Sequence, residues 1–312
     1  MTWIDALATM LGSPLMQRAL IAAVLVGAAA PVVGTFLVQR RMSLMGDGIG
    51  HVALTGVALG WLIGNGLHLV PHDSLAVPGA VALAVLGSIV IELVRERGRT
   101  NGDLALALMF YGGIAGGVLL IKLAGGTNSN LISYLFGSIS TVSGVDLVWT
   151  VGLAVLVLVV GVGLRSALFA VSYDEEFARA SGLPVRLLNM LIATIAALTV
   201  TVAMRVVGLL LVSALMIVPV AIAQLFTHSF SRTMTFASIV GVAVSVVGLA
   251  ITYWQDFPPG ATIVVLAIGI YGVTATLRPL VRRPLPSGDP HPDVSDDVLL
   301  PASSAPDHAQ AL

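Results

Sequence analysis

Two residue types that can hold a metal ion lie four positions apart within the stretch 42–61, MSLMGDGIGHVALTGVALGW. Asp47 and His51 would project from nearly the same face of a helix, because four residues make about one turn. The stretch is apolar and glycine-rich, and an acid at the centre of a membrane costs on the order of 3 kcal/mol. A carboxylate beside an imidazole is a ligand pair for a divalent transition metal. The structural alternatives are an acid near a helix start and a buried histidine bonded to a neighbouring group.

The composition indicates a membrane protein. Of the 312 residues, 57% are hydrophobic and 10% are charged, and the mean hydropathy is +1.00. A soluble domain contains roughly 45–50% apolar residues, so we expect an all-α, polytopic helical bundle surrounded by membrane lipid. The net charge of −1 provides no basic surface for nucleic acid. The absence of cysteine excludes disulfides, thiolate metal sites and cysteine catalysis.

Common enzyme motifs are absent from the sequence. The only lysine, Lys122, follows isoleucine instead of the glycine that a phosphate-binding GxxxxGK[ST] loop requires. The chain therefore has no such nucleotide-hydrolysing loop of its own. HExxH and GxSxG motifs are also missing, which argues against an intramembrane enzyme.

Repeated apolar runs predict the topology of the bundle. About nine segments of roughly twenty residues, the length that crosses a bilayer core, occupy residues 15–277. They give eight or nine spans, depending on whether Arg205 separates two helices. The polar run 127–144 should form a short helix that does not cross. Residues 1–14 are expected to lie at the interface, and the Pro-, Ser- and Asp-rich residues 284–312 to form a disordered cytoplasmic tail.

The basic residues predict the orientation of the spans. If the N-terminus lies outside and the C-terminus inside, twelve of the fifteen Lys and Arg residues fall on the inner side, and only Arg18, Lys122 and Arg205 fall outside. This orientation places residues 172–184 in the cytoplasm.

Three further residues could bind metal less directly. His68, His72 and Asp73 lie in a predicted outside loop, where they could pass a metal ion inward, although loop histidines are often merely solvated. Glu92 near the inner end of the third segment is expected to pair with Arg95 or with a neighbouring helix.

A short polar helix is predicted between the fifth and sixth apolar segments, over residues 174–181. Ser172 and Glu175 fit a capping box, with Ser172 as the N-cap. Gly182 suits the left-handed position after a helix, and Pro184 prevents continuation. A helix of about two turns is marginal alone, so tertiary contacts must hold it. Its charged face, available to a cytoplasmic partner, comprises Glu175, Glu176 and Arg179.

Five segments together resemble the permease subunits of bacterial zinc, manganese and iron ABC importers. The resemblance covers about Leu15 to Thr276. Each motif alone is weak, but the set is specific. The segments are Gly46-Asp47-x-x-x-His51-x-x-x-x-Gly56, Leu135-Phe136-Gly137-Ser138, Asp174-Glu175-Glu176-Phe177-Ala178-x-x-x-Gly182, Val207-Gly208-x-Leu210-Leu211-Val212-x-Ala214-Leu215-x-x-x-Pro219 and Pro259-Gly260-Ala261-x-Ile263-Val264.

The resemblance implies a homodimeric permease in the bacterial cytoplasmic membrane. Its partners would be two cytoplasmic ATPase subunits and an extracytoplasmic metal-binding protein. Asp47 and His51 match the family's metal-pathway motif. The short helix would dock into the ATPase, and Phe177 departs from the alanine of the broader importer pattern. The residues assigned to this coupling are Asp174, Glu175, Glu176, Ala178, Arg179 and Gly182.

The predicted function is therefore ATP-driven import of a divalent transition-metal ion by alternating access. One carboxylate and one imidazole bind a dication weakly enough for it to leave. Zinc is the first choice because imidazole suits it, and manganese or iron remain alternatives. A second class is a self-sufficient, proton-coupled metal carrier that uses Asp47 and His51 as a proton relay. The short cytoplasmic helix argues against such a carrier, which would have no use for it.

Overall fold

The structure, a computed structural model, describes residues 9–69, 74–97, 102–137, 143–255 and 257–281. These residues form helices joined by short connections, and no strand occurs among them. The helices are α2 (Pro14–Gln39), α3 (Met45–Gly66), α4 (Ala76–Glu96), α5 (Gly102–Leu123), α6 (Asn128–Phe136), α7 (Gly144–Gly163), α8 (Arg165–Tyr173), α9 (Glu175–Ala180), α10 (Val185–Val207), α11 (Leu209–Phe226), α12 (Phe230–Trp254) and α13 (Pro259–Val281).

The predicted membrane bundle is confirmed. Within the described ranges, nine helices are long and apolar enough to cross a bilayer. The short α6 falls inside the polar run 127–144 and has only nine residues, as expected for a helix that does not cross. The outside N-terminus and inside C-terminus remain predictions. Most of the interfacial segment 1–14 and the whole tail 284–312 lie outside the described residues.

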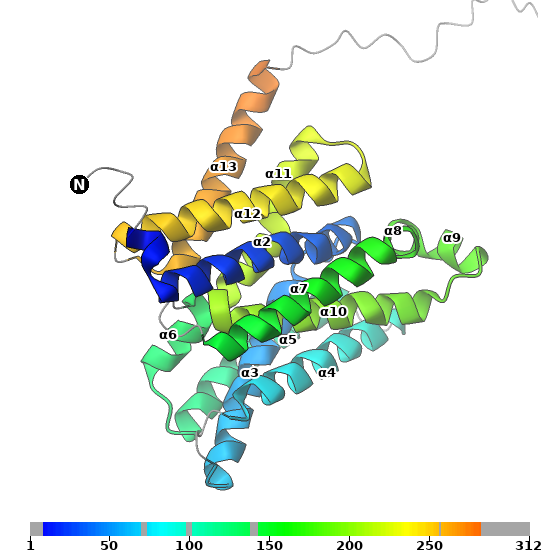
Figure 1. Cartoon of the computed structure of the whole chain (residues 1–312). Coiled ribbons are helices and arrows are strands. Elements are labelled where there is room, and N and C mark those ends of the chain that lie inside the picture. Colours follow the sequence, from blue (N-terminus) through cyan, green and yellow to red (C-terminus); the bar gives the residue numbers. More distant parts are fainter. Residues whose placement is uncertain (1–8, 70–73, 98–101, 138–142, 256, 282–312) are drawn as a thin grey trace, which may run out of the picture.

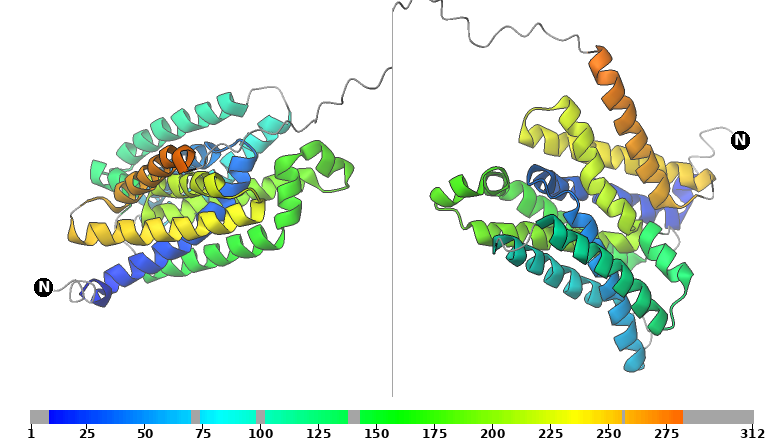
Figure 2. Two further views of the ribbon diagram at one scale, coloured as in Figure 1. Left: turned by 90° about the horizontal axis from the view of Figure 1, so that it is seen from above. Right: turned by 180° about the vertical axis from the view of Figure 1, so that it is seen from behind.

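The spans pack around α2 and α10. Helix α2 lies against α7, α11 and α12, and α10 lies against α4, α2 and α11, whereas α3 is held between α4 and α5. Figure 1 shows that α8 and α9 form a tip at one end of this bundle and that α13 projects away from it. The two further views in Figure 2 show the same tip beyond the ends of the long helices.

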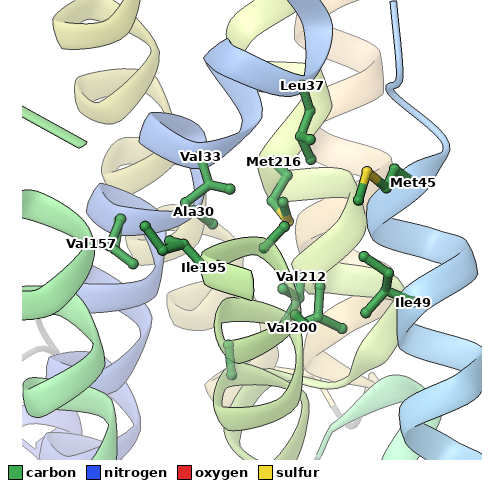
Figure 3. Packing of buried hydrophobic residues seen from close by; sticks show 14 of the residues in the cluster. Ala30, Val33, Leu37, Met45, Ile49, Val157, Ile195, Val200, Val212 and Met216 are labelled. Atoms are coloured by element: carbon green, nitrogen blue, oxygen red, sulfur yellow. The ribbon is translucent and has the colours of Figure 1, made fainter. Parts of the chain in front are cut away.

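The core lies where α2, α3, α7, α10 and α11 meet. Small and branched apolar side chains, together with methionines, fill the space between these helices, as Figure 3 shows. Close packing of these side chains fixes how the helices sit against one another. The residues labelled there are Ala30, Val33, Leu37, Met45, Ile49, Val157, Ile195, Val200, Val212 and Met216.

The expected break at Arg205 is wrong in position. Helix α10 continues through Arg205 to Val207, and the chain turns at Gly208, whose φ is +88°. A single arginine does not end a helix, because arginine has a high helix propensity and leaves the backbone hydrogen bonds intact. A glycine in the left-handed region does end one.

The predicted capping box at Ser172 is also wrong. Ser172 lies inside α8, and the N-cap of α9 is Asp174, whose Oδ1 accepts a 2.9 Å hydrogen bond from the amide of Phe177. Both residues are good caps, but helix α8 extends the chain through Tyr173 and moves the start of α9 to the aspartate. The predicted end is confirmed, because Gly182 follows the helix with φ +80°.

Candidate functional site

Asp47 and His51 lie on one face of α3, near the start of the helix. The Nε2 atom of His51 is 3.9 Å from Oδ1 of Asp47. The histidine side chain is 7% exposed and that of the aspartate is 23% exposed. The two groups are therefore neighbours, but they are too far apart for a strong hydrogen bond.

Of the structural alternatives, a first-turn acid fits Asp47, whereas a side-chain N-cap and a hydrogen-bonded histidine are not seen among the described residues. Asp47 is in the first turn of α3, but the N-cap is Leu44 and no side chain caps the helix. Neither Oδ1 of Asp47 nor Nδ1 of His51, both buried, has a hydrogen-bond partner among the described residues. Buried polar atoms are normally satisfied, so these orphaned atoms fit groups that hold a ligand.

Helix α5 covers the histidine. The Phe110 ring meets the His51 ring edge-on, with 4.5 Å between the ring centroids. The backbones come close at Gly113, where a Cβ would stand 2.6 Å from the carbonyl carbon of His51. Thr55 ties the same helices together, because its hydroxyl donates a 2.8 Å hydrogen bond to the carbonyl oxygen of Gly113. The position of the imidazole thus depends on this close approach of α3 and α5.

Of the weaker metal candidates, the described one, His68, does not lie near this pair. His68 is exposed just beyond the other end of α3, seventeen residues and about 25 Å along the helix from His51. His72 and Asp73 lie outside the described residues. In the described part of the chain, no three His, Asp or Glu side chains gather as a metal site would require. A complete coordination shell would therefore need ligands from elsewhere.

The predicted coupling residues divide between the two sides of α9. Glu176, Phe177 and Arg179 are exposed, and the Phe177 side chain at 67% exposure is a large apolar group for a surface helix. Ala178 is fully buried against the bundle. Asp174 and Gly182 bound the helix as its N-cap and its left-handed terminating residue.

Glu175 points inward instead of joining the exposed face. Its Oε1 accepts hydrogen bonds from Arg95 (2.6 Å), Asn189 (3.2 Å) and Arg40 (3.3 Å). Arg95 also bonds to Glu92 at 2.7 Å, which confirms the expected pairing of Glu92. Burial opposes ionisation of Glu175, but the hydrogen bonds and charges of Arg95 and Arg40 outweigh it and lower the pKa of this carboxyl. We call Arg40, Glu92, Arg95, Glu175 and Asn189 the ionic cluster.

Three of the motif segments meet in one backbone contact. Gly137 at the end of α6 lies against Gly208 between α10 and α11, and Gly260 at the start of α13 lies against the backbone of Phe136 and Val207 beside them. A Cβ on Gly260 would stand 2.5 Å from the carbonyl oxygen of Phe136. A Cβ on Gly208 would collide with the backbone of Gly137. The glycines of these motifs are therefore required by packing, as close backbone approach demands.

Comparison with known proteins identifies the family. The sequence pattern of the ABC 3 transport family matches residues 13–278. The chain belongs to this family. The recognition made from the five motifs is thus confirmed, and with it the prediction that the chain is a transport subunit that leaves ATP hydrolysis to a separate ATPase.

Two relatives are similar to this chain over most of their length. The manganese transport system membrane protein MntC of Halalkalibacterium halodurans is 32% identical over 264 residues, which are 85% of this chain and 87% of that protein. The manganese import system permease protein ScaB of Streptococcus gordonii is 33% identical over 267 residues, 86% of this chain and 92% of the relative.

Solved structures share the architecture. PsaBC from Streptococcus pneumoniae, solved in complex with Fab, superposes with a TM-score of 0.76 at 31% identity, over 88% of this chain and 95% of that one. An inward-facing conformation of a putative metal-chelate type ABC transporter has a TM-score of 0.63 at 17% identity, which shows a common fold.

Sequence reasoning found the pair on α3 because its spacing is local. It missed three contacts from distant parts of the chain. Phe110 packs on His51, and Arg40 and Asn189 hydrogen-bond to Glu175. A partial signal was present, because arginine after an apolar span and glutamate within one are costly unless they find partners.

Proposed function

We propose that this chain is the membrane permease of an ATP-driven importer of a divalent transition-metal ion, in which Asp47 and His51 contact the ion during its passage. The observation that carries the proposal is the buried pair of orphaned ligand atoms, Oδ1 of Asp47 and Nδ1 of His51, within a chain of the ABC 3 transport family. A carboxylate oxygen and an imidazole nitrogen suit manganese, iron and zinc.

Manganese is the first ion to test. The sequence alone favoured zinc because of the imidazole, but the named relatives are manganese transport and import systems. One carboxylate and one imidazole leave a dication incompletely coordinated, which suits an ion that must be released.

The resemblance to the importer family also suggests that the permease works as a homodimer. Helix α5, which packs on His51, leaves apolar side chains uncovered on its other side, where a partner copy or lipid can cover them. These side chains include Leu104, Leu108, Tyr111 and Leu119.

The remaining partners follow from the family. The exposed side of α9 would dock into a cytoplasmic ATPase, and an extracytoplasmic binding protein would deliver the ion to a bacterial cytoplasmic membrane. ATP binding and hydrolysis would then open the pathway alternately to each side.

The test is uptake of manganese, zinc or iron into vesicles that contain the chain, its ATPase and its binding protein. We expect ATP-dependent uptake of manganese, and a loss of at least about tenfold in the variants Asp47→Asn and His51→Ala. His228→Ala, which removes an exposed histidine from the α11–α12 connection, is the matched control and should transport normally. Normal transport by both site variants would remove the pair from the pathway. Uptake that persists without the ATPase would indicate a secondary carrier instead.

A further inference from the structure

Three elements of the bundle converge on one oxygen atom of the short helix α9. The Oε1 atom of Glu175 accepts hydrogen bonds from Arg40, which follows α2, from Arg95 in the last turn of α4, and from Asn189 in α10. Glu175 is the first residue of α9, so the same atom joins the helix start to all three spans.

The ionic cluster lies where the C-terminal ends of α2 and α4 meet the N-terminal ends of α9 and α10. Arg40 and Arg95 stand at the C-terminal ends of α2 and α4, where a cation is favoured, and Glu175 stands at the N-terminal end of α9, where an anion is favoured. The helix dipoles therefore support both arginines and Glu175, whereas Glu92, near the C-terminal end of α4, depends on its arginine partners. Arg40 and Glu92 are almost fully buried, each with 3% of its side chain exposed.

Within the described residues, few other polar contacts hold α9 to the spans. Its exposed side chains, Glu176, Phe177 and Arg179, face away from the bundle, and Ala178 offers only a small apolar contact. A force applied to the exposed side of α9 would reach the spans chiefly through Glu175 and the backbone connections on either side of the helix.

Stability alone does not explain this arrangement. Buried ion pairs contribute little net stability, because the cost of removing the charges from water offsets their attraction. Nη1 of Arg40 and Oδ1 of Asn189 are buried without a partner in the described part of the chain, which adds to that cost. Directional bonds to a single atom do, however, fix the position of α9 relative to three spans.

We propose that Glu175 is the positioning residue that transmits movement of α9 to α2, α4 and α10, through its bonds to Arg40, Arg95 and Asn189. This inference rests on the proposed function, in which an ATPase docks on α9. It assigns the two sides of the helix different tasks. The exposed side binds the partner, and Glu175 passes the displacement to the transmembrane helices.

The test uses the complete complex of permease, ATPase and binding protein in vesicles, with manganese uptake and ATP hydrolysis measured together. Glu175→Gln keeps the shape of the side chain but removes its charge. We expect this complex to assemble and to hydrolyse ATP, with about tenfold less metal transported per ATP, which corresponds to a modest coupling free energy. A ratio equal to that of the wild type would overturn the proposal.

The matched control is Glu96→Gln. Glu96 also pairs with an arginine, Arg186, and this pair also joins α4 to α10, with 3.3 Å between Oε2 and Nε. Its side chain is 42% exposed and makes no ion pair with α9 among the described residues. The control should keep the wild-type ratio, and an equal loss in both variants would show that any charge change at this end disturbs transport.

A milder variant tests the same inference if the Glu175→Gln complex does not assemble. Asn189→Ala removes one neutral donor to the same oxygen atom, and we expect an intermediate fall in metal transported per ATP. An unchanged ratio in an assembled Asn189→Ala complex would overturn the inference. The proposed function fails separately, if the wild-type complex itself shows neither uptake of a divalent metal nor metal-dependent hydrolysis.

Discussion

The Nη2 atom of Arg95 lies 2.6 Å from Oε1 of Glu175, and this ion pair joins a transmembrane helix to a short helix 80 residues later in the chain. The pair belongs to a cluster with two nearly buried charges, Arg40 and Glu92. The end of the bundle that carries α9 is therefore organised by charge, whereas the interior is organised by apolar packing.

Removal of the buried arginine should destabilise the protein. Arg40→Ala would leave Glu92 buried beside only one remaining cation, and loss of one partner of a buried pair costs about 3–5 kcal/mol. Unfolding of the purified protein in detergent measures this loss. Arg186→Ala, which removes an arginine side chain that is 63% exposed, should change stability by less than about 0.5 kcal/mol. Similar losses in both variants would contradict the special role of burial.

The contribution of Glu175 to the free energy of unfolding should depend on pH. Its pKa in the folded protein lies below the ordinary value of 4.5, so its stabilisation is complete above that pH and is lost as the pH falls through the lowered pKa. Unfolding midpoints of the wild type and Glu175→Gln should differ by a constant amount from neutral pH down to this range and converge below it. A gap that widens in acid would contradict the lowered pKa.

The close approach of α5 to His51 predicts a position-specific effect of an added methyl group. Gly113→Ala would place Cβ 2.6 Å from the carbonyl carbon of His51, which forces the two helices apart at a typical overpacking cost of about 1–3 kcal/mol. Metal uptake should fall, because Phe110 and the imidazole lose their fixed contact. Gly112→Ala, where the added Cβ meets no atom within 4 Å, is the adjacent control. Equal behaviour of the two variants would exclude the packing explanation.

The turn at Gly208 combines two constraints that can be separated. Gly208→Ala suffers both a backbone conformation that glycine alone adopts readily (φ +88°, ψ +151°) and the collision with Gly137. Gly125→Ala, with φ +77° and open space around its Cβ, suffers only from its positive φ. A sparsely populated backbone conformation costs about 1–3 kcal/mol. We expect a clearly larger loss of the folded, assembled protein for Gly208→Ala, measured by thermal unfolding. Equal losses would mean that the glycine contact adds no constraint.

The spans could be predicted from the sequence because hydropathy and length act locally. The end of α10 could not be predicted in this way. A charged residue within an apolar run, such as Arg205, suggests the end of a span, but it does not change the backbone geometry. The true end depends on Gly208, whose left-handed φ is stabilised by contact with α6 and α13. The start of α9 was misplaced for a similar reason, because continuation of α8 through Ser172 is a tertiary choice between two adequate caps.

In the candidate site too, local spacing could be predicted from the sequence and long-range contacts could not. Asp47 and His51 share one helix face by their spacing alone, so the sequence predicts that they are neighbours. The bond between Arg40 and Glu175 spans 135 positions, and no local pattern reveals which arginine meets which glutamate. Even the inward direction of Glu175 depends on the packing of α9, because the sequence placed this residue on the same charged face as Glu176 and Arg179.

The contact of Gly137, Gly208 and Gly260 lies at the opposite end of α10 from the ionic cluster. The backbones at this contact leave no room for a Cβ, so α6 and α13 hold the C-terminal end of α10 closely. Helix α10 has 23 residues and is therefore about 34 Å long, so a tilt of about 5° about this end would displace its α9 end by about 3 Å. A small rotation near the glycines would thus correspond to a much larger displacement at α9.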